Sequence, residues 1–545
     1  MFKPEPAIEF LLKRTARTDR ESAAQLAKDL GYLPLALDQA AAYLRLTGTT
    51  FSQYTARLHT LIGSQVEGGA YGRSIGATLD LAIETTLAKE PMAEDVLAFS
   101  AFLAPERIPL DLIDAVLANT NNRDSVLISL SASSLISHDP LPLDVPAISI
   151  HRLVQLAMRN RLAGAGALEA ILERSVTILW DAFPNASYNR PTEWQRCEQL
   201  LPHAVVALEH ASIANIRSFT VARLANSVGC YLLAREVPGR AEQYFRKALG
   251  IAHETVGREH FETATILNNL ALVLGKIGSH AEAEKGYRDS VELAEKLHGR
   301  RSQAVATNLN NLAFFFQYLG REVEAEPLFR ESVNITEQLL GREHPDFAVR
   351  LHNLGFCLRN TGCIIEADEI VREAISVGEK SLGRQHNHFA AFLTTLADIK
   401  ERLGHVSAAE ALIGESIAIL ERTCGRNHPE TASSLCQFGQ ILCQTNRPAD
   451  AEVLFREALS IYIASYGAIH PGVAISRGNL APLLLETGRT RECEKESREA
   501  LQVLDAFFGR GHASTRGAAS VLAEALDQLG RLSEGSEVRR RYGLG

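Results

Sequence analysis

Hydrophobic side chains recur with helical spacing through the second half of the chain. In the stretch ETATILNNLALVLGKIG, the positions Ile266, Leu270 and Leu274 fall on one helix face, and Gly278 ends the run. The next stretch, SHAEAEKGYRDSVELAEKLHG, opens on Ser279, a favourable N-cap, and again places its apolar residues on one face. The pattern therefore predicts a unit of two helices.

This helical unit is repeated at a fixed interval. A GREH-like element begins at 257, 299, 341, 383, 425, 467 and 509, and an NNLA-like element keeps the same 42-residue interval from 268 onward. One helix pair cannot bury its own apolar face, whereas stacked pairs share a continuous core. We therefore predict a helical solenoid with a degenerate first copy. The predicted repeats are 215–256, 257–298, 299–340, 341–382, 383–424, 425–466, 467–508 and 509–545.

The repeat resembles the tetratricopeptide repeat. Small residues stand where the two helices must cross, at Ala271 and Ala283, and the aromatic Tyr287 fills the gap beside them. The 42-residue length and the G-x-x-H-P linker look like the variety found in kinesin light chains. The resemblance covers residues 215–545 and implies a superhelical solenoid that binds a peptide or partner protein in its concave groove.

The linkers between repeats carry histidines that invite a metal or catalytic interpretation. They are His260, His344, His386, His428, His470 and His512, with Ser302 in the remaining linker. Equivalent residues of stacked repeats lie roughly 15–20 Å apart, whereas ligands lie about 2 Å from a shared ion. We therefore expect no metal site and no catalytic residue here. Each imidazole should instead bond backbone at the start of a first helix.

One proline interrupts this regular pattern. Pro482 falls inside the first helix of the repeat that begins at 467, four residues after Gly478. A proline lacks the amide hydrogen and presses on the carbonyl four residues earlier. We therefore predict a kink or break near 478–482.

The N-terminal part predicts further helices and one hairpin. LIS at 135–137 and AISI at 147–150 flank a proline-rich turn and predict two strands, and the helix HRLVQLAMRNRL follows directly. Trp194 is expected to anchor the packing of a helix that caps the solenoid. The predicted segments are a helical segment at 1–62, a linker at 63–75, a compact helical unit with the hairpin at 76–163, a helical adaptor at 164–214 and the solenoid at 215–545.

Two features of this part resemble the NB-ARC family of switch ATPases. The segment GYLPLAL at 31–37 resembles the family's GLPLA segment, and the helices and hairpin of 76–163 look like its winged-helix domain. With the repeats that follow, the order matches the C-terminal two thirds of an NB-ARC (STAND-type) repeat protein. The fold class implied is all-α: a tetratricopeptide repeat solenoid preceded by a winged helix and an N-terminal helical remnant.

The segment SIHRLVQ at 149–155 resembles the MHD-type motif that closes the winged helix of that family, with Ile150 in place of Met and Arg152 in place of Asp. The resemblance implies that Pro34 and His151 would contact nucleotide only if a nucleotide-binding module were supplied. A histidine that opens a helix after a strand is equally a cap. Both alternatives stay open at this point.

Composition narrows the possible partners. The chain has 545 residues, of which 46% are hydrophobic, and its 56 basic and 65 acidic residues give a net charge of −9, which argues against a nucleic-acid partner. We find no apolar run of about 18 residues that could span a membrane and no signal peptide. The eight cysteines form no C-x-x-C pair. Reduced thiols in a cytoplasmic protein, with no membrane partner, are expected.

Catalytic motifs are missing from the sequence. We find no G-x-x-x-x-G-K-[ST], G-x-S-x-G or H-E-x-x-H pattern. We therefore expect neither an enzyme nor a bound cofactor, with ADP or ATP held only through a separate nucleotide-binding module. Two functions remain. One is a scaffold or sensor that binds a peptide or protein; the other is the regulatory half of a STAND switch whose NTPase module lies on a missing or separate segment.

The groove itself is expected on the first helix of each pair. One predicted column contains Asn226, Asn268, Asn310 and His352, whose polar groups could bond the backbone of an extended peptide. Neighbouring basic residues are Arg223, Lys276 and Arg359, and the later acidic ones are Asp398, Glu401, Glu486, Glu524 and Asp527. The pattern predicts a partner that is acidic or has a free C-terminus, docked near 223–359.

Overall fold

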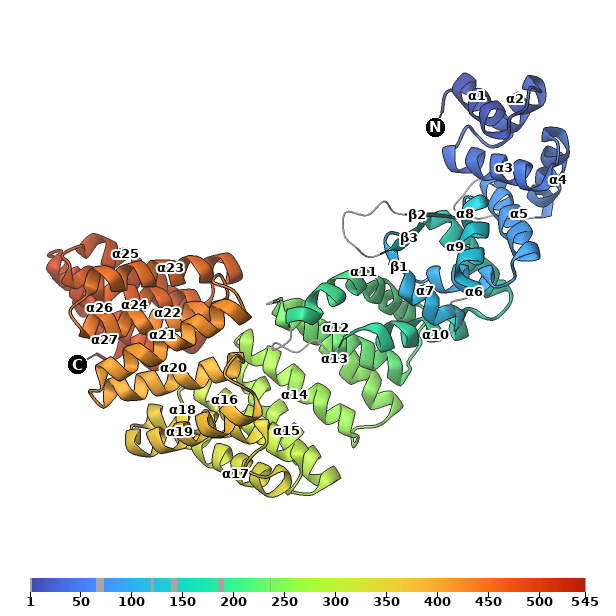
Figure 1. Cartoon of the computed structure of the whole chain (residues 1–545). Coiled ribbons are helices and arrows are strands. Elements are labelled where there is room, and N and C mark those ends of the chain that lie inside the picture. Colours follow the sequence, from blue (N-terminus) through green and yellow to red (C-terminus); the bar gives the residue numbers. More distant parts are fainter. Residues whose placement is uncertain are drawn as a thin grey trace. The chain divides into compact units, whose positions relative to one another are not determined.

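The computed structural model describes residues 2–64, 73–118, 122–138, 146–184, 191–235 and 237–544. Helices dominate the fold (Figure 1), and the chain divides into two compact units. The N-terminal unit comprises Met1–Arg235 and Gln243–Val256, and the repeat unit comprises Glu236–Glu242 and Gly257–Gly545. The helices of the first predicted repeat, 215–256, therefore belong mainly to the N-terminal unit.

The N-terminal unit begins with four helices and ends with the helix pair of residues 215–256. Of the predicted linker 63–75, residues 65–72 lie outside the described part of the chain. The elements are α1 (Pro4–Thr15), α2 (Arg20–Asp29), α3 (Pro34–Thr47), α4 (Phe51–Ser64), α5 (Arg73–Lys89), α6 (Ala93–Ser100), β1 (Ile108–Pro109), α7 (Leu110–Leu117), α8 (Arg123–Ala132), β2 (Ile136–His138), β3 (Ala147–Ile150), α9 (Arg152–Gly164), α10 (Leu168–Ala182), α11 (Pro191–Ile213), α12 (Phe219–Ala234) and α13 (Pro238–Thr255).

The GYLPLAL segment forms the tight turn between α2 and α3. Gly31 and Tyr32 have φ values of 62° and 55°, and the Tyr32 amide donates to the Ala27 carbonyl over 3.0 Å, which closes the end of α2. Pro34 takes the first position of α3, where its fixed φ suits the helix and no amide hydrogen is needed. Local backbone geometry thus accounts for this motif.

Helices α1 to α5 enclose a core of their own. Leu11, Leu26, Leu37 and Tyr54 are fully buried in it, and Leu81 of α5 joins the same cluster. The apolar faces of these amphipathic helices meet one another, which is the main stabilising contribution available to such short helices.

The predicted hairpin is present, with one strand more than expected. Strand β3 is central in an antiparallel sheet of order β1-β3-β2. Ile136 of β2 lies opposite Ile150, and Ile108 of β1 lies opposite Ile148. Strand β1 has only two residues, too few to produce a detectable alternation. Residues 139–145 lie outside the described part, and the identification of this segment as a winged helix stays a prediction.

The repeat unit consists of stacked helix pairs. Ala271 and Ala283 are fully buried where the first two helices cross, and Tyr287 is 2% exposed beside them, as predicted. The pairs are α14 (Phe261–Lys276) with α15 (His280–His298), α16 (Gln303–Tyr318) with α17 (Glu322–Leu340), α18 (Pro345–Thr361) with α19 (Ile364–Ser381), α20 (Asn387–Arg402) with α21 (Val406–Thr423), α22 (Pro429–Gln444) with α23 (Pro448–Tyr466), α24 (Pro471–Glu486) with α25 (Thr490–Phe508), and α26 (Ala513–Gln528) with α27 (Leu532–Tyr542).

The linker histidines cap the first helices, as the sequence predicted. In all six, Nδ1 accepts from the backbone amide two residues later, at 3.1–3.3 Å. In the remaining linker, Ser302 Oγ accepts from the Val305 amide at 3.4 Å. Burial lowers the pKa of His386 and His512, which favours the neutral imidazole that can accept such a bond.

This capping role makes a testable prediction at His344, whose Nδ1 accepts from the Asp346 amide at 3.1 Å. Replacing His344 with alanine should lower the free energy of unfolding by about 0.5–2 kcal/mol. Replacing it with serine should restore most of that loss, because Ser302 caps the preceding repeat. Thermal or urea denaturation of the two variants measures the difference. Equal losses in both would show that capping is not the role of this imidazole.

The first helices of the pairs line the inner face of the solenoid. Each one, from α14 to α24, packs against the first helix of the next pair, whereas contacts between successive second helices are weaker. A stack whose two rows differ in spacing curves toward the closer row. Side chains on the exposed side of α14, α16 and α18 therefore face the inner groove.

The predicted break at Pro482 is wrong, because α24 continues through it from Pro471 to Glu486, and the alternative of a kink stays a prediction. Residues on both sides of the proline, Leu480 and Leu484, are fully buried. Their packing holds the helix across the lost hydrogen bond. Gly478 supplies the carbonyl on which the ring would press, and the absence of a side chain there leaves room for adjustment.

Distant helix pairs of the repeat unit meet. His280 Nε2, at the start of α15, lies 3.0 Å from the Phe507 carbonyl oxygen at the end of α25, 227 residues away. The Tyr318 ring packs edge-on against Phe507 and Phe508, with centroids 6.1 and 5.1 Å apart. The curvature of the solenoid therefore brings its first two pairs against the junction of α25 and α26.

Candidate functional site on the inner face

The predicted amide column forms hydrogen bonds between neighbouring repeats. Asn268 Oδ1 accepts from Asn311 Nδ2 at 3.1 Å, and Asn310 Oδ1 accepts from Asn353 Nδ2 at 3.0 Å. Asn268 is only 9% exposed. These bonds join α14 to α16 and α16 to α18, a role that the sequence did not reveal. Contact of this column with a ligand stays a prediction.

His352 continues the same seam toward the next repeat. Its Nε2 lies 2.8 Å from Thr395 Oγ1, and burial lowers its pKa to about 3, so the imidazole is neutral near pH 7. Further along, Gln437 Nε2 donates to the Thr394 carbonyl at 3.0 Å. The seam is thus a ladder of polar contacts that fixes successive first helices relative to one another.

Arg359 is engaged by a neighbouring carboxylate and a ring. Its Nη1 lies 2.8 Å from Asp398 Oδ2, and the two side chains are 14% and 12% exposed. The guanidinium also lies 4.0 Å from the centroid of the Phe356 ring. Arg402 approaches the same carboxylate at 3.3 Å. The predicted boundary between a basic and an acidic half of the groove is therefore an internal ion pair across α18 and α20.

The two remaining basic residues of the predicted site, Arg223 and Lys276, lie in different units. Arg223 and Asn226 lie on α12 of the N-terminal unit. The Arg223 guanidinium stacks on Trp180 and Phe219, with distances of 4.5 and 4.9 Å to the ring centroids. Lys276 is half-buried at the end of α14 in the repeat unit.

An apolar patch, which the sequence analysis missed, lies beside the polar ladder. Leu272, Phe314 and Phe356 occupy one position in three successive first helices, and we call them the inner-face patch. Leu272 is 36% exposed and Phe314 is 53% exposed, while Phe356 is half-buried under Arg359. Aligned exposed apolar side chains mark an interaction surface more often than isolated ones do. The 42-residue spacing of these three positions is visible in the sequence, but their exposure is not.

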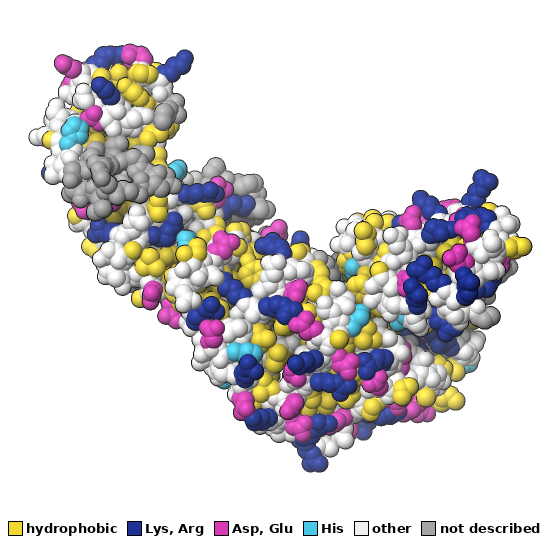
Figure 2. Space-filling model, turned by 180° about the vertical axis from the view of Figure 1, so that it is seen from behind, with side chains coloured by type: hydrophobic (Ala, Val, Ile, Leu, Met, Phe, Trp, Pro, Cys, Tyr) yellow, Lys and Arg dark blue, Asp and Glu magenta, His cyan; other side chains and the backbone are white. Residues whose placement is uncertain are grey.

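The outer surface carries a repeated arginine clamp. The arginine after the linker glycine bonds a glutamate five residues earlier and another thirty-one residues later; Arg300, for example, reaches Glu295 at 2.8 Å and Glu331 at 2.6 Å. Figure 2 shows basic and acidic side chains side by side over the repeats. The same arrangement holds for Arg342 with Glu337 and Glu373, Arg384 with Glu379 and Glu415, and Arg426 with Glu421 and Glu457. The clamp ties successive second helices together.

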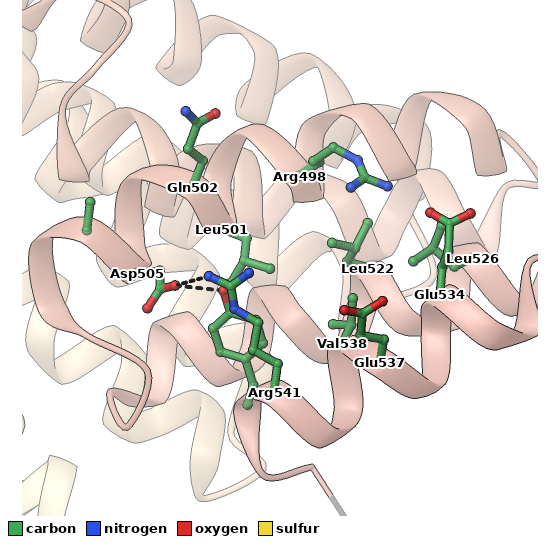
Figure 3. A pocket seen from close by; sticks show the side chains of 12 residues that line it. Arg498, Leu501, Gln502, Asp505, Leu522, Leu526, Glu534, Glu537, Val538 and Arg541 are labelled. Carbon is green, nitrogen blue, oxygen red and sulfur yellow. Dashed lines mark hydrogen bonds and ion pairs between the residues drawn. The ribbon is translucent and has the colours of Figure 1, made fainter.

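A hollow of about 550 Å³ opens between α25 and α27, where the clamp is altered (Figure 3). The position thirty-one residues after Arg510 holds Arg541 instead of glutamate. Asp505 lies 3.3 Å from Arg541 Nη2 and accepts from the Tyr542 hydroxyl at 2.8 Å. Asp505 and Arg541, joined by a dashed line in Figure 3, are therefore paired within the wall.

A second hollow, of about 480 Å³, lies in the N-terminal unit between the sheet and α11. Its wall includes His203, which is 1% exposed and whose Nε2 lies 3.2 Å from the Arg107 carbonyl oxygen. Burial lowers the pKa of His203 to about 4. This imidazole is neutral near pH 7 and bonds backbone, which fits a structural role between β1 and α11.

The two residues of the NB-ARC resemblance lie at helix starts. His151 Nδ1 accepts from the Leu153 amide at 3.2 Å, so it caps α9, and burial and the neighbouring Arg152 lower its pKa. Pro34 is exposed at the first position of α3. The capping alternative for His151 is confirmed, and nucleotide contact by either residue stays a prediction.

One cluster of the described residues brings three potential metal ligands together. The ligand atoms of Cys424, His428 and Glu430 all lie within 4.8 Å of one another. However, His428 Nδ1 already accepts from the Glu430 amide at 3.2 Å. Burial raises the pKa of the Cys424 thiol and disfavours the thiolate that a metal requires. The cluster is best explained by the cap of α22. Among the described helices, none combines the length and apolar composition needed to cross a bilayer.

Comparison with known proteins identifies the repeats. The tetratricopeptide repeat family matches residues 220–296, 305–346, 347–388 and 388–464. A nucleotide-binding leucine-rich repeat (NLR)-like protein of Hyaloscypha variabilis (strain UAMH 11265 / GT02V1 / F) is 26% identical over 262 residues, which are 46% of this chain and 26% of that protein. The match thus spans about a quarter of the relative's length.

Of two solved structures that align with this chain, the first is similar to it in fold. The STAND (signal transduction ATPase with numerous domains) protein with a tetratricopeptide repeat sensor from Pyrococcus horikoshii gives a TM-score of 0.58 at 12% identity, over 100% of this chain and 72% of that one. A putative kinesin light chain of Podosopora anserina, with nearly identical TPR-like repeats, gives a TM-score of 0.31 at 22% identity, over 38% of this chain and 97% of that one.

Proposed function

We propose that this chain, whose residues 220–296, 305–346, 347–388 and 388–464 match the tetratricopeptide repeat family, is a non-catalytic scaffold or sensor whose inner face binds a segment of a partner protein. The inner-face patch carries this proposal. Leu272 and Phe314 expose apolar surface on helices whose other apolar residues are mostly buried. Aromatic residues, Phe included, are enriched in protein interfaces relative to the rest of the surface.

The charges of the groove favour a ligand with apolar and basic residues. The sequence suggested a ligand that is acidic or has a free C-terminus. Arg359 pairs with Asp398, so α18 offers little positive charge to such a ligand. Glu486 and Glu524 are exposed on α24 and α26. We therefore propose an extended segment whose apolar side chains meet the patch and whose basic end lies toward these carboxylates.

A selection experiment tests this proposal. Peptides are enriched from a random display library on the full chain and then measured for binding to the wild type and to a variant with Leu272, Phe314 and Phe356 replaced by serine. We expect enriched peptides to be rich in apolar and basic residues and to lose most of their affinity for the variant. A library that yields no binder, or binders indifferent to all three changes, would exclude the inner face as the binding site.

The fold of the STAND protein from Pyrococcus horikoshii, which matches 100% of this chain, favours a second candidate. We propose as the alternative that this chain forms the sensor half of a nucleotide-dependent switch. On its own it should bind neither ATP nor ADP more tightly than about 1 mM, or roughly −4 kcal/mol, and should hydrolyse neither. Calorimetric titration of the chain with ADP measures this. Micromolar affinity would show a nucleotide site within the chain itself.

A further inference from the structure

The arginine clamp is absent from the linker that follows its four complete copies. The linker between α23 and α24 has Ala468 where the four preceding ones have arginine, and Ile463 where they have the first glutamate. The second glutamate is kept, as Glu499. Its side chain is 43% exposed and meets Arg477 Nη2 at 2.9 Å. One carboxylate of the clamp therefore remains without the guanidinium that holds its equivalents elsewhere.

The backbone of this linker is unchanged. Gly467 has φ 78° and ψ 170°, against 79° and 169° for Gly341. His470 Nδ1 accepts from the Gly472 amide at 3.1 Å, as the other capping histidines do. The side-chain replacements alone therefore distinguish this linker from its neighbours.

A buried ion pair replaces an apolar pair in the same repeat. Arg477 and Glu496 stand where the preceding repeat has Leu435 and Leu454. Arg477 bonds Glu496, and the two side chains are 13% and 10% exposed. With Glu499 added, one guanidinium is shared by two carboxyl groups. Repeats 299–340 to 425–466 all have apolar residues at both positions.

These replacements coincide with a pocket of about 390 Å³, which we call the linker pocket. Its apolar wall comes from Val503, Ala506 and Phe507 of α25 together with Ile469, whose side chain is 88% exposed. Its polar wall comes from Arg477, Glu499 and Gln502. In the preceding repeat Arg426, the equivalent of Ala468, bonds Glu457, the equivalent of Glu499.

We propose that the linker pocket binds a segment of a partner protein that places a large apolar side chain beside a lysine or arginine. The apolar side chain packs against Ile469, Val503 and Phe507. The cation meets Glu499 and supplies from the partner the positive charge that Ala468 omits. The surplus carboxyl group in the set Arg477, Glu496 and Glu499 favours a basic partner over an acidic one. This site is distinct from the inner-face patch and does not rest on it.

The chain offers its own control for this proposal. The variant Ile463→Glu/Ala468→Arg rebuilds the clamp of the preceding repeats and should close the pocket without loss of melting temperature. A random peptide library is depleted on this clamp-restored variant and then selected on the wild type. We expect the enriched peptides to contain an apolar residue next to lysine or arginine. They should bind the clamp-restored variant at least tenfold more weakly, and Phe314→Ala should leave their affinity unchanged.

A second variant guards against a folding defect in the first. Ile469→Asp changes an exposed side chain, so it should fold normally, and it should weaken the same peptides at least tenfold. The proposal is overturned if no peptide discriminates the wild type from the two variants, or if the selected peptides pair the apolar residue with an acid. Self-association of the wild type in analytical ultracentrifugation that both variants abolish would identify a second copy of the chain as the occupant and would also overturn it.

Discussion

Replacing Arg477 with leucine is expected to lower the free energy of unfolding by about 3–5 kcal/mol. The change leaves the Glu496 carboxylate, 10% exposed, without its partner in the interior of the repeat. A buried charge that loses its counter-ion keeps its desolvation cost and loses the compensating attraction. As a control, Arg330→Leu removes a guanidinium that is 42% exposed and should cost less than about 1 kcal/mol.

The double variant Arg477→Leu/Glu496→Leu should recover the lost stability. It reproduces the apolar pair found at Leu435 and Leu454 in the preceding repeat, and well-packed apolar replacements of buried ion pairs are often neutral or stabilising. Thermal denaturation of the wild type, the two single variants and the double variant completes a double-mutant cycle. If the double variant melts as low as Arg477→Leu alone, the apolar residues do not pack there as they do in the other repeats.

Replacing Phe314 with alanine is expected to weaken a peptide selected on the inner face by about 2 kcal/mol, roughly 30-fold in Kd. The Phe314 side chain is 53% exposed, so its truncation should leave the melting temperature nearly unchanged. Fluorescence anisotropy with a labelled peptide measures the affinity.

A matched change on the outer surface controls for general effects. Val323 at the start of α17 is 85% exposed, and Val323→Ala should alter neither binding nor stability. Equal loss of affinity in the two variants would mean that the peptide does not distinguish the inner face from the outer one.

The helix pairs and their caps could be predicted from the sequence, because both depend on local patterns that the chain repeats. Two markers at one interval defined the pairs, and a histidine, or Ser302 in one linker, defined the cap of each first helix from α14 to α26. The break at Pro482 was predicted wrongly for the same reason. The local rule holds for an isolated helix, whereas burial of Leu480 and Leu484 on either side keeps this one continuous.

Contacts between repeats were harder to predict. The hydrogen bond from Asn311 to Asn268 joins residues 43 positions apart. Which two side chains meet depends on the rotation between neighbouring helix pairs, and the sequence repeat does not give that rotation. The contact of His280 with Phe507 depends on the same rotation summed over several pairs. The arginine clamp was accessible, because its arginines and glutamates keep fixed offsets in four successive repeats.

The candidate site was predicted only in outline. The choice of the first helices for the inner face agrees with their closer packing. The chosen amides, however, proved to lie on the seam between helices, and Arg359 proved to be paired with Asp398. Regularly spaced polar residues can bond neighbouring helices of the solenoid or bond a ligand. Their burial in the structure distinguishes the two roles, and the sequence does not show it.

Binding of a partner segment on the inner face is most directly tested by photo-crosslinking from position 314. A benzophenone amino acid is placed there in one variant and at position 323 in another, and each is irradiated with the selected peptide and analysed by mass spectrometry. We predict a crosslinked peptide from position 314 and none from position 323. A crosslink from 323 alone, or none from 314 while the peptide still binds that variant, would contradict the assignment of the inner face as the binding surface.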